Sequence, residues 1–320
     1  MDLQQRKSAV ALLSVVSNTL LVLFKLIVGL AIGSVSVISE AIHSAVDLMA
    51  ACIALFAVRR AARPADECHP FGHGKVENVS GTVEALLIFV AAGWIIYEAV
   101  HKLYRREPLE SVGWGVAVML VSALTNQVVS RLLFKVGRET DSIALQADAW
   151  HLRTDVYTSA GVMVGLLAIA AGHRLLPGLD LTWVDPVAAI LVALLILRAA
   201  WQLTVRSGRD LLDARLPGEE QAWLLAYLGR LGPEVCGYHN LRTRKAGNMR
   251  FIDLHVQVAS ALSVDQGHAI AHDVSSGIKE RFRGAYVIVH IEPCRGDEAE
   301  QATAAAPAGH ADGGAAGRKA

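Results

Sequence analysis

Long apolar runs fill the first two thirds of the chain and then stop. Six stretches reach the roughly 20 mostly apolar residues that a membrane helix needs. They cover about residues 9–32, 35–58, 79–103, 112–134, 143–171 and 183–204. A soluble core has little room for six such segments in a row, so the pattern predicts six transmembrane helices. We expect the first run to be retained and not cleaved, because it contains Lys25 and lacks a signal-peptide cleavage site.

The loops between these runs predict an orientation. With the N-terminus on the cytoplasmic side, the inner segments carry more Lys and Arg than the outer loops. Such an excess is typical of cytoplasmic loops. Six spans then place both termini in the cytoplasm, as in a multi-pass protein of the inner (plasma) membrane.

From residue 214 the pattern changes to short amphipathic segments. An amphipathic helix is followed by two alternating strands around Ala246-Gly247-Asn248, a second helix that opens with the capping box Ser263-x-x-Gln266, and a third strand. We therefore predict an α-helical membrane domain over 1–213 and a small α+β domain of order αββαβ over 214–295. The tail, 296–320, is rich in Ala and Gly and is expected to be disordered.

Composition narrows the class further. The 30 basic and 30 acidic side chains balance, so the chain lacks the excess of positive charge that nucleic-acid binding requires. The mean hydropathy of +0.39 averages a lipid-facing part and a soluble part. The four cysteines form no CxxC and predict neither a disulfide framework nor a zinc ribbon, which favours a reducing compartment for the soluble part.

Two predicted spans carry the same polar motif. The second span contains His43 and Asp47, and the fifth contains His151 and Asp155, each pair four residues apart on one helix face. His43 lies about ten residues from the turn at Gly33, or roughly 15 Å at 1.5 Å per residue, which is near the middle of the bilayer. Charged groups at that depth are costly and usually functional. A helix-packing hydrogen-bond network is the alternative.

Two imidazoles and two carboxylates form a metal-ligand set. The second and fifth spans run in opposite directions, so packing them together brings His43 level with Asp155, and Asp47 level with His151. Tetrahedral nitrogen and oxygen ligation suits Zn²⁺, and Cd²⁺ or Co²⁺ are close alternatives, whereas Ca²⁺ and Mg²⁺ prefer more oxygens. Glu40 and Asp148, each three residues before a histidine, are candidate acceptors for the imidazole N–H or polar residues at a water-filled mouth. Lys25 is expected to snorkel toward the membrane surface.

The two HxxxD motifs, the loop Phe71-Gly72-His73-Gly74-Lys75 and the αββαβ end together resemble the cation diffusion facilitator family of metal/proton antiporters. The resemblance covers about residues 9–294. It implies a divalent-cation efflux transporter, most simply a zinc/proton antiporter working by alternating access, and not an enzyme. The histidine in the second-span pair, where well-studied bacterial members have two aspartates, implies a preference for zinc.

The resemblance also implies further sites and a homodimer. A metal site in the inner loop would use Asp66, His69 and His73, with Cys68 as a departure from the expected pattern. A cytoplasmic site would use residues from the strands and the second helix of the soluble domain: His239, His255, His268, His290 and Glu292. Lys75 and Asp213 match an interlocking salt bridge at the membrane–cytoplasm junction. The alternatives are that these residues are ordinary loop and surface groups.

Two other functions remain open at this point. An intramembrane metalloprotease would require HExxH to place a general base beside the zinc, and neither motif contains it. A membrane zinc sensor would use the same four residues as a structural site. Transport by the purified protein distinguishes these alternatives.

Overall fold

The structure, a computed structural model, describes residues 3–33, 35–105, 114–175, 183–232 and 234–294. The chain divides into two compact units with a boundary between Leu212 and Asp213, and the turn Ala246–Asn248 is grouped with the first unit. The predicted tail, 296–320, lies outside the described residues.

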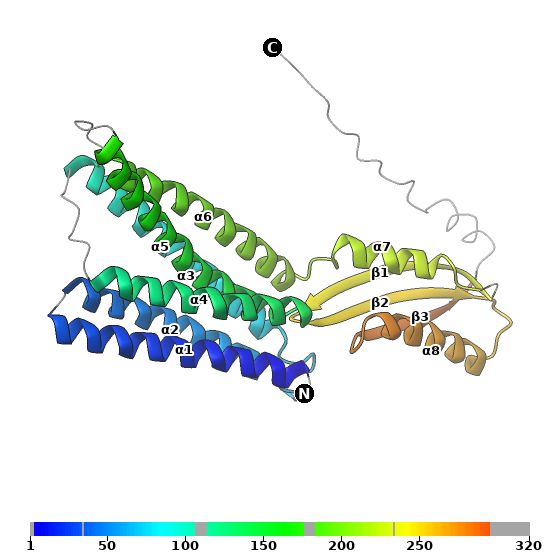
Figure 1. The fold of residues 1–320 in the computed structure, drawn as a ribbon. Helices are drawn as coiled ribbons and strands as arrows, with labels where there is room; N and C mark the ends of the chain where they lie inside the picture. Colours follow the sequence, from blue (N-terminus) through cyan, green and yellow to red (C-terminus); the bar gives the residue numbers. More distant parts are fainter. Residues whose placement is uncertain (1–2, 34, 106–113, 176–182, 233, 295–320) are drawn as a thin grey trace, which may run out of the picture. The chain divides into compact units, whose positions relative to one another are not determined.

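The first unit is a bundle of six long helices (Figure 1). Their bounds are α1 Leu3–Ile32, α2 Val35–Ala61, α3 Lys75–Arg105, α4 Trp114–Glu139, α5 Ile143–Leu175 and α6 Val184–Leu211. The strongest packing joins α1 to α2, α3 to α6 and α4 to α5, and α2 also packs against α5. The prediction of six long helices in this part of the chain is confirmed.

Five of these helices are long and apolar enough to cross a membrane, among the residues that the structure describes. The helix outside this set is α5, which carries Asp148, Arg153 and Asp155 along its first half. Large apolar side chains cover the outside of the bundle: Ile27, Val90 and Trp94 are each about two thirds exposed. This arrangement suits a lipid environment, where an apolar exterior has no cost.

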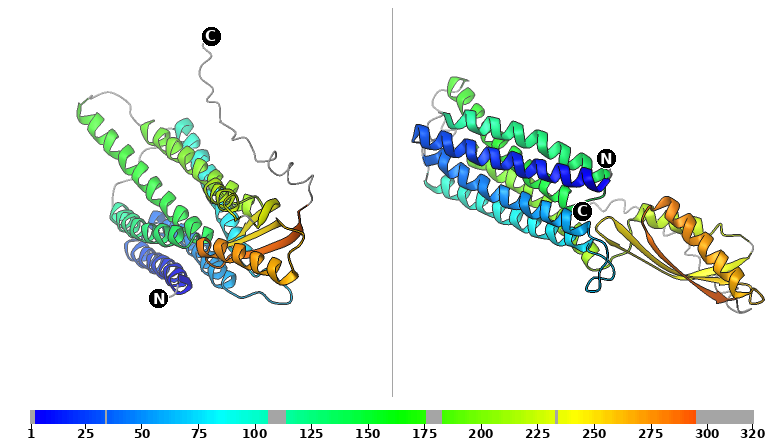
Figure 2. Two further views of the ribbon diagram at one scale, coloured as in Figure 1. Left: turned by 90° about the vertical axis from the view of Figure 1, so that its right-hand side faces the viewer. Right: turned by 90° about the horizontal axis from the view of Figure 1, so that it is seen from below.

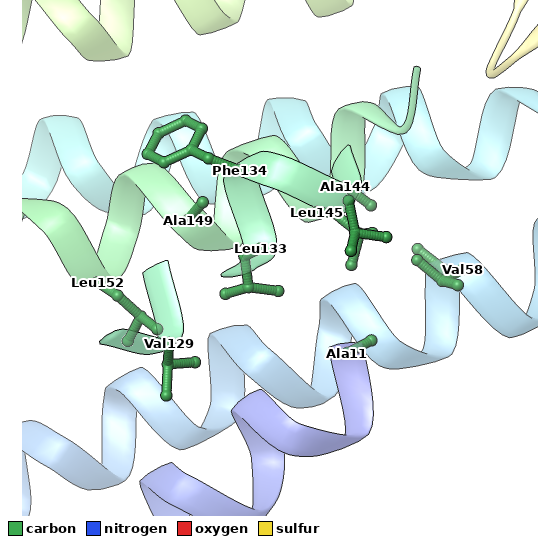
Figure 3. Packing of buried hydrophobic residues seen from close by; sticks show 11 residues of the cluster. Ala11, Val58, Val129, Leu133, Phe134, Ala144, Leu145, Ala149 and Leu152 are labelled. Atoms are coloured by element: carbon green, nitrogen blue, oxygen red, sulfur yellow. The ribbon is translucent and has the colours of Figure 1, made fainter. Parts of the chain in front are cut away.

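Small side chains bring four helices close together in the bundle core. Ala11 of α1, Ala144 and Ala149 of α5 and Leu133 of α4 are fully buried in one cluster (Figure 3). Small residues allow close approach of helix backbones, which is how transmembrane helices gain packing contacts. The cluster joins α5 to α2 and α4, and α1 to α4.

The turn between α1 and α2 depends on two glycines. Gly33 adopts a positive φ of 66°, which an L side chain rarely tolerates. A Cβ atom on Gly29 would approach the Ile38 side chain to 2.9 Å. The two helices are therefore closely packed at this end.

The second unit is a three-stranded sheet with two helices on one face (Figure 2). Its elements are α7 Gly218–Leu228, β1 Val235–Ala246, β2 Met249–Val258, α8 Val264–Arg281 and β3 Tyr286–Pro293. The strand order is β1-β2-β3, and β2 pairs with β3 in parallel with His255 opposite His290. The predicted order αββαβ is confirmed, as is the capping box, in which Ser263 and Gln266 exchange both hydrogen bonds.

Alternation along β2 separates core from surface. Ile252, Leu254 and Val256 are buried against α7 and α8, while His255 lies on the opposite face. The sheet therefore presents one face without helices, and the histidines lie on it.

The prediction that no cysteines pair is wrong for Cys236 and Cys294. These two residues form a disulfide across 58 residues, with a Cα–Cα distance of 6.4 Å. The bond joins the start of β1 to the residue after β3, and these two positions are brought together only by the sheet. Cys52 and Cys68 are free and exposed.

Candidate functional site

The two HxxxD motifs meet in the middle of the helix bundle. One ligand atom each from His43, Asp47 and Asp155 lies within 4.8 Å of the other two. Nε2 of His151 lies 3.0 Å from Oδ1 of Asp47. Antiparallel packing of α2 and α5 thus places the histidine of one helix beside the aspartate of the other.

The four side chains differ in access. Asp47 and His151 are buried, at 4% and 6% exposure, whereas Asp155 is half-buried and His43 is exposed. The side chains of the group therefore range from the buried Asp47 and His151 to the exposed His43.

Asn126 of α4 supports the group and was missed by the sequence reasoning. Its side-chain amide donates to Oδ2 of Asp155 at 3.3 Å. This bond leaves the other carboxylate oxygen of Asp155 for an ion. The available signal was the four-residue spacing of Ser122, Asn126 and Ser130 within an apolar span.

Glu40 and Asp148 are not hydrogen-bonded to the imidazoles. Glu40 pairs with Lys25, whose Nζ lies 3.2 Å from Oε2 of the glutamate. Asp148 is fully buried, and among the described residues its carboxylate oxygens make no hydrogen bond of normal geometry. Nδ1 of His151 likewise has no hydrogen-bond partner in the described part of the chain. Their role as acceptors for the imidazole N–H stays a prediction.

A second acid lies close to Asp148. Glu84 of α3 is fully buried, accepts a hydrogen bond from Ser80 at 3.1 Å through Oε1, and has no partner for Oε2 among the described residues. It interacts electrostatically with both Asp148 and His151. The sequence signal was a glutamate five residues into the apolar run 79–103, which the reasoning from the HxxxD motifs left unused.

The loop between α2 and α3 brings its three predicted ligands together. Asp66, His69 and His73 offer ligand atoms within 4.8 Å of one another. Oδ1 of Asp66 lies 3.2 Å from Nδ1 of His69, and Oδ2 lies 3.3 Å from Nε2 of His73. A hydrogen bond from the His69 backbone N–H lowers the pKa of Asp66, so the loop favours the ionised carboxylate. Cys68 is exposed and is not part of this group.

The face of the sheet opposite α7 and α8 carries a third cluster of candidate metal ligands. His239, His255 and Glu292 offer ligand atoms within 4.8 Å of one another. Glu292 joins them: its Oε1 lies 2.7 Å from Nδ1 of His255, and its Oε2 lies 3.2 Å from Nε2 of His239. The hydrogen bond from His255 is the main cause that lowers the pKa of Glu292, with the neighbouring histidines adding to it.

The remaining predicted ligands lie at or beyond the edge of this group. His290 is adjacent, with Nε2 3.5 Å from Oε1 of Glu292. His268 of α8 is exposed and is not brought to the group within the described residues. Asn240, which the sequence reasoning missed, has its amide nitrogen 3.3 Å from Nε2 of His255. Its backbone has a positive φ of 54°, which a short polar residue tolerates.

The predicted Lys75–Asp213 salt bridge would join the two units and stays a prediction. Within the first unit, Lys75 donates to the carbonyl of Leu211 at 3.3 Å. Within the second, Asp213 lies 3.5 Å from Arg244.

Comparison with known proteins decides the family. The family model described as "Cation efflux transmembrane domain" matches residues 11–212, and "Cation efflux protein, cytoplasmic domain" matches residues 216–294. The chain belongs to the cation diffusion facilitator family. Members of this family are cation-efflux transporters, not enzymes, so the intramembrane metalloprotease is set aside and the chain is a multi-pass membrane transporter.

Full-length relatives support the same assignment. The uncharacterized transporter sll1263 of Synechocystis is 36% identical over 262 residues, which is 82% of each chain. The cation-efflux pump FieF of Klebsiella pneumoniae is 32% identical and covers 89% of this chain and 92% of its own. A solved structure of the putative zinc transporter CzrB in its zinc form matches 25% of this chain and 92% of its own at 29% identity, with a TM-score of 0.22. That score is too low to support an argument.

Proposed function

We propose that this cation diffusion facilitator exports cytoplasmic Zn²⁺ in exchange for protons. The observation that carries the proposal is the meeting of His43, Asp47, His151 and Asp155 in the middle of the bundle. Two imidazole nitrogens and two carboxylate oxygens match the four-coordinate preference of zinc. The metal is the transported substrate, and the four side chains are its proposed carriers.

The ligand set favours zinc over harder cations. Ca²⁺ takes six to eight oxygens, and Mg²⁺ keeps several of its waters, so neither suits a site in which half the ligands are nitrogen. Cd²⁺ and Co²⁺ accept the same donor atoms and are expected to be transported as well. Transport rates measured for a panel of divalent ions rank Zn²⁺, Cd²⁺ and Co²⁺ as substrates.

Proton exchange follows from the contact between Asp47 and His151. The carboxylate oxygen and the imidazole nitrogen lie 3.0 Å apart, which is within hydrogen-bonding distance. Zinc binding requires a neutral imidazole and a free carboxylate, so loading the site releases protons. Protonation from the outer side then weakens ligation, and the ion leaves.

Alternating access explains how one site serves both sides. Rocking of one group of helices against the other would expose the site first to the cytoplasm and then outward. We place the protein in the inner (plasma) membrane with both termini in the cytoplasm. The second unit would bring two copies together as a homodimer, with zinc on the His239, His255 and Glu292 group, and zinc at Asp66, His69 and His73 in the loop.

Reconstituted transport tests the proposal. The purified full chain in proteoliposomes should move Zn²⁺ at a rate that rises with an opposing proton gradient, and Asp47→Asn should reduce it by about 100-fold. Asp273→Asn is the matched control, since this exposed carboxylate lies on α8 of the second unit. A zinc flux that does not depend on the pH gradient would contradict proton exchange. Undiminished flux in Asp47→Asn would contradict the site.

A further inference from the structure

Lys25 does not snorkel to the membrane surface. The side chain lies in the last third of α1, seven residues before its end at Ile32, and is buried, with 5% exposure. Its ammonium donates to Oγ of Ser44 at 2.8 Å and to Oε2 of Glu40 at 3.2 Å, both on α2. Figure 2 shows α1 and α2 side by side along their length. The prediction from sequence is corrected because α2 supplies these partners within the bundle.

The partners of Lys25 place its charge next to the transport site. Glu40 lies one helical turn before His43, and Ser44 follows His43 directly. The ammonium also interacts electrostatically with Asp155 across the group. A fixed positive charge thus lies beside the residues that would hold a divalent cation.

The packing of α1 on α2 keeps the charge there. Gly29 follows Lys25 by one turn, and its backbone approaches Ile38 so closely that a Cβ atom would lie 2.9 Å from that side chain. Ser44 is buried beside the ammonium. The close packing of the two helices and the bond to Ser44 therefore hold the Lys25 ammonium against α2.

We propose that the Lys25–Glu40 pair sets the affinity of the transport site, with Lys25 weakening the binding of the cation and Glu40 offsetting that effect. The inference rests on the proposed transport site. A site of two carboxylates and two imidazoles alone would hold zinc firmly and release it slowly. The ammonium repels the ion, and the half-exposed carboxylate of Glu40 limits the repulsion. Both residues act as positioning charges, since neither is a proposed ligand.

Opposite effects on affinity follow from charge. Lys25→Gln makes the surroundings of the site more negative by one charge and should lower the KM for zinc about tenfold. The maximal rate should fall as well, because release becomes slower. Glu40→Gln makes the surroundings more positive and should raise KM about tenfold. The double variant restores the charge balance, and its KM should lie within about threefold of the native value.

The experiment is zinc transport by the full chain in proteoliposomes, with KM and maximal rate measured separately. Lys25→Arg, which keeps the charge, should retain the native KM and so separates charge from packing. If the pair only ties α1 to α2, Lys25→Gln and Glu40→Gln should both shift KM in the same direction, or both leave it unchanged. Either result overturns the proposal. If Lys25→Gln does not fold, Glu40→Gln still decides the question, because Glu40 is half-exposed and its replacement should be tolerated. An unchanged or lowered KM for zinc in Glu40→Gln would then contradict the inference.

Failure of this inference and failure of the transport site give different results. If Asp47→Asn abolishes flux while the two charge variants shift KM alike, the site stands and the role of Lys25 is wrong. If Asp47→Asn transports zinc normally, the site itself is wrong.

Discussion

Nε2 of His151 lies 3.0 Å from Oδ1 of Asp47, although 104 residues separate them in the sequence. The contact joins the first third of α5 to the middle of α2, and both side chains are buried. A motif on one helix therefore completes the motif on the other.

Asn126→Ala should reduce zinc flux about tenfold, because the amide orients the carboxylate of Asp155. Losing a residue that orients a metal ligand typically costs 10- to 100-fold in affinity or activity. Flux at low zinc concentration in proteoliposomes measures the effect. Thr125→Val is the control, since its hydroxyl donates to the carbonyl of Val121 in its own helix. Equal flux in the two variants would contradict the role given to Asn126.

Glu84→Gln should stabilise the helix bundle. Glu84 is fully buried with Oε2 unpaired, so the native protein bears the cost of burying an acid beside Asp148. An amide of the same size cannot become charged beside Asp148, and we expect a gain of about 1 kcal/mol or more in the free energy of unfolding. Thermal unfolding in detergent measures it, with Glu98→Gln on the same helix as control. A lower unfolding temperature for Glu84→Gln than for the control would refute the argument.

Opening the Cys236–Cys294 disulfide should destabilise the second unit. A bond that closes a loop of this length is typically worth about 2–4 kcal/mol. Denaturant unfolding of the full chain, followed by a spectroscopic signal from the sheet, gives the free energy of unfolding of the second unit. The measurement is made with and without a thiol reductant. Cys68→Ser is the control because that thiol is free and exposed. Two free thiols at positions 236 and 294 in protein purified without reductant would contradict the bond.

Glu292 should make the second unit sensitive to acid. Its pKa is lowered in the folded state, mainly by the hydrogen bond from His255. A lowered folded pKa gives stability that is fully present above the ordinary value of 4.5 and is lost as pH falls through the folded pKa. Glu292→Gln should remove this part of the acid sensitivity.

Unfolding midpoints measured between about pH 3 and pH 6 test the effect. Glu280→Gln on α8 serves as the control. If the native chain and Glu292→Gln lose stability over the same pH range and to the same extent, the hydrogen bond is not the cause.

Periodicity in the sequence predicted the six helices and the αββαβ unit, because long apolar runs and alternating strands are local patterns. The spacing in His43-x-x-x-Asp47 and in its counterpart on α5 also predicted which residues approach one another. These predictions needed only helix geometry and the antiparallel direction of two spans.

Features that depend on how the helices are rotated against one another could not be predicted from the sequence. The contacts of Asn126 with Asp155 and of Lys25 with Glu40 require knowing which face of α4 or α1 is turned inward. The pairing of Cys236 with Cys294 requires the complete sheet, since the two residues come from its first and last strands. Single polar residues in apolar spans were the available signal in the first two cases.

Simultaneous recording of zinc and protons tests the central claim most directly. Proteoliposomes that contain the full chain, a zinc indicator and a pH indicator should show zinc uptake together with proton movement in the opposite direction. Both signals should disappear in Asp155→Asn and persist in Asp273→Asn. Zinc uptake without proton movement, or native uptake in Asp155→Asn, would contradict the account.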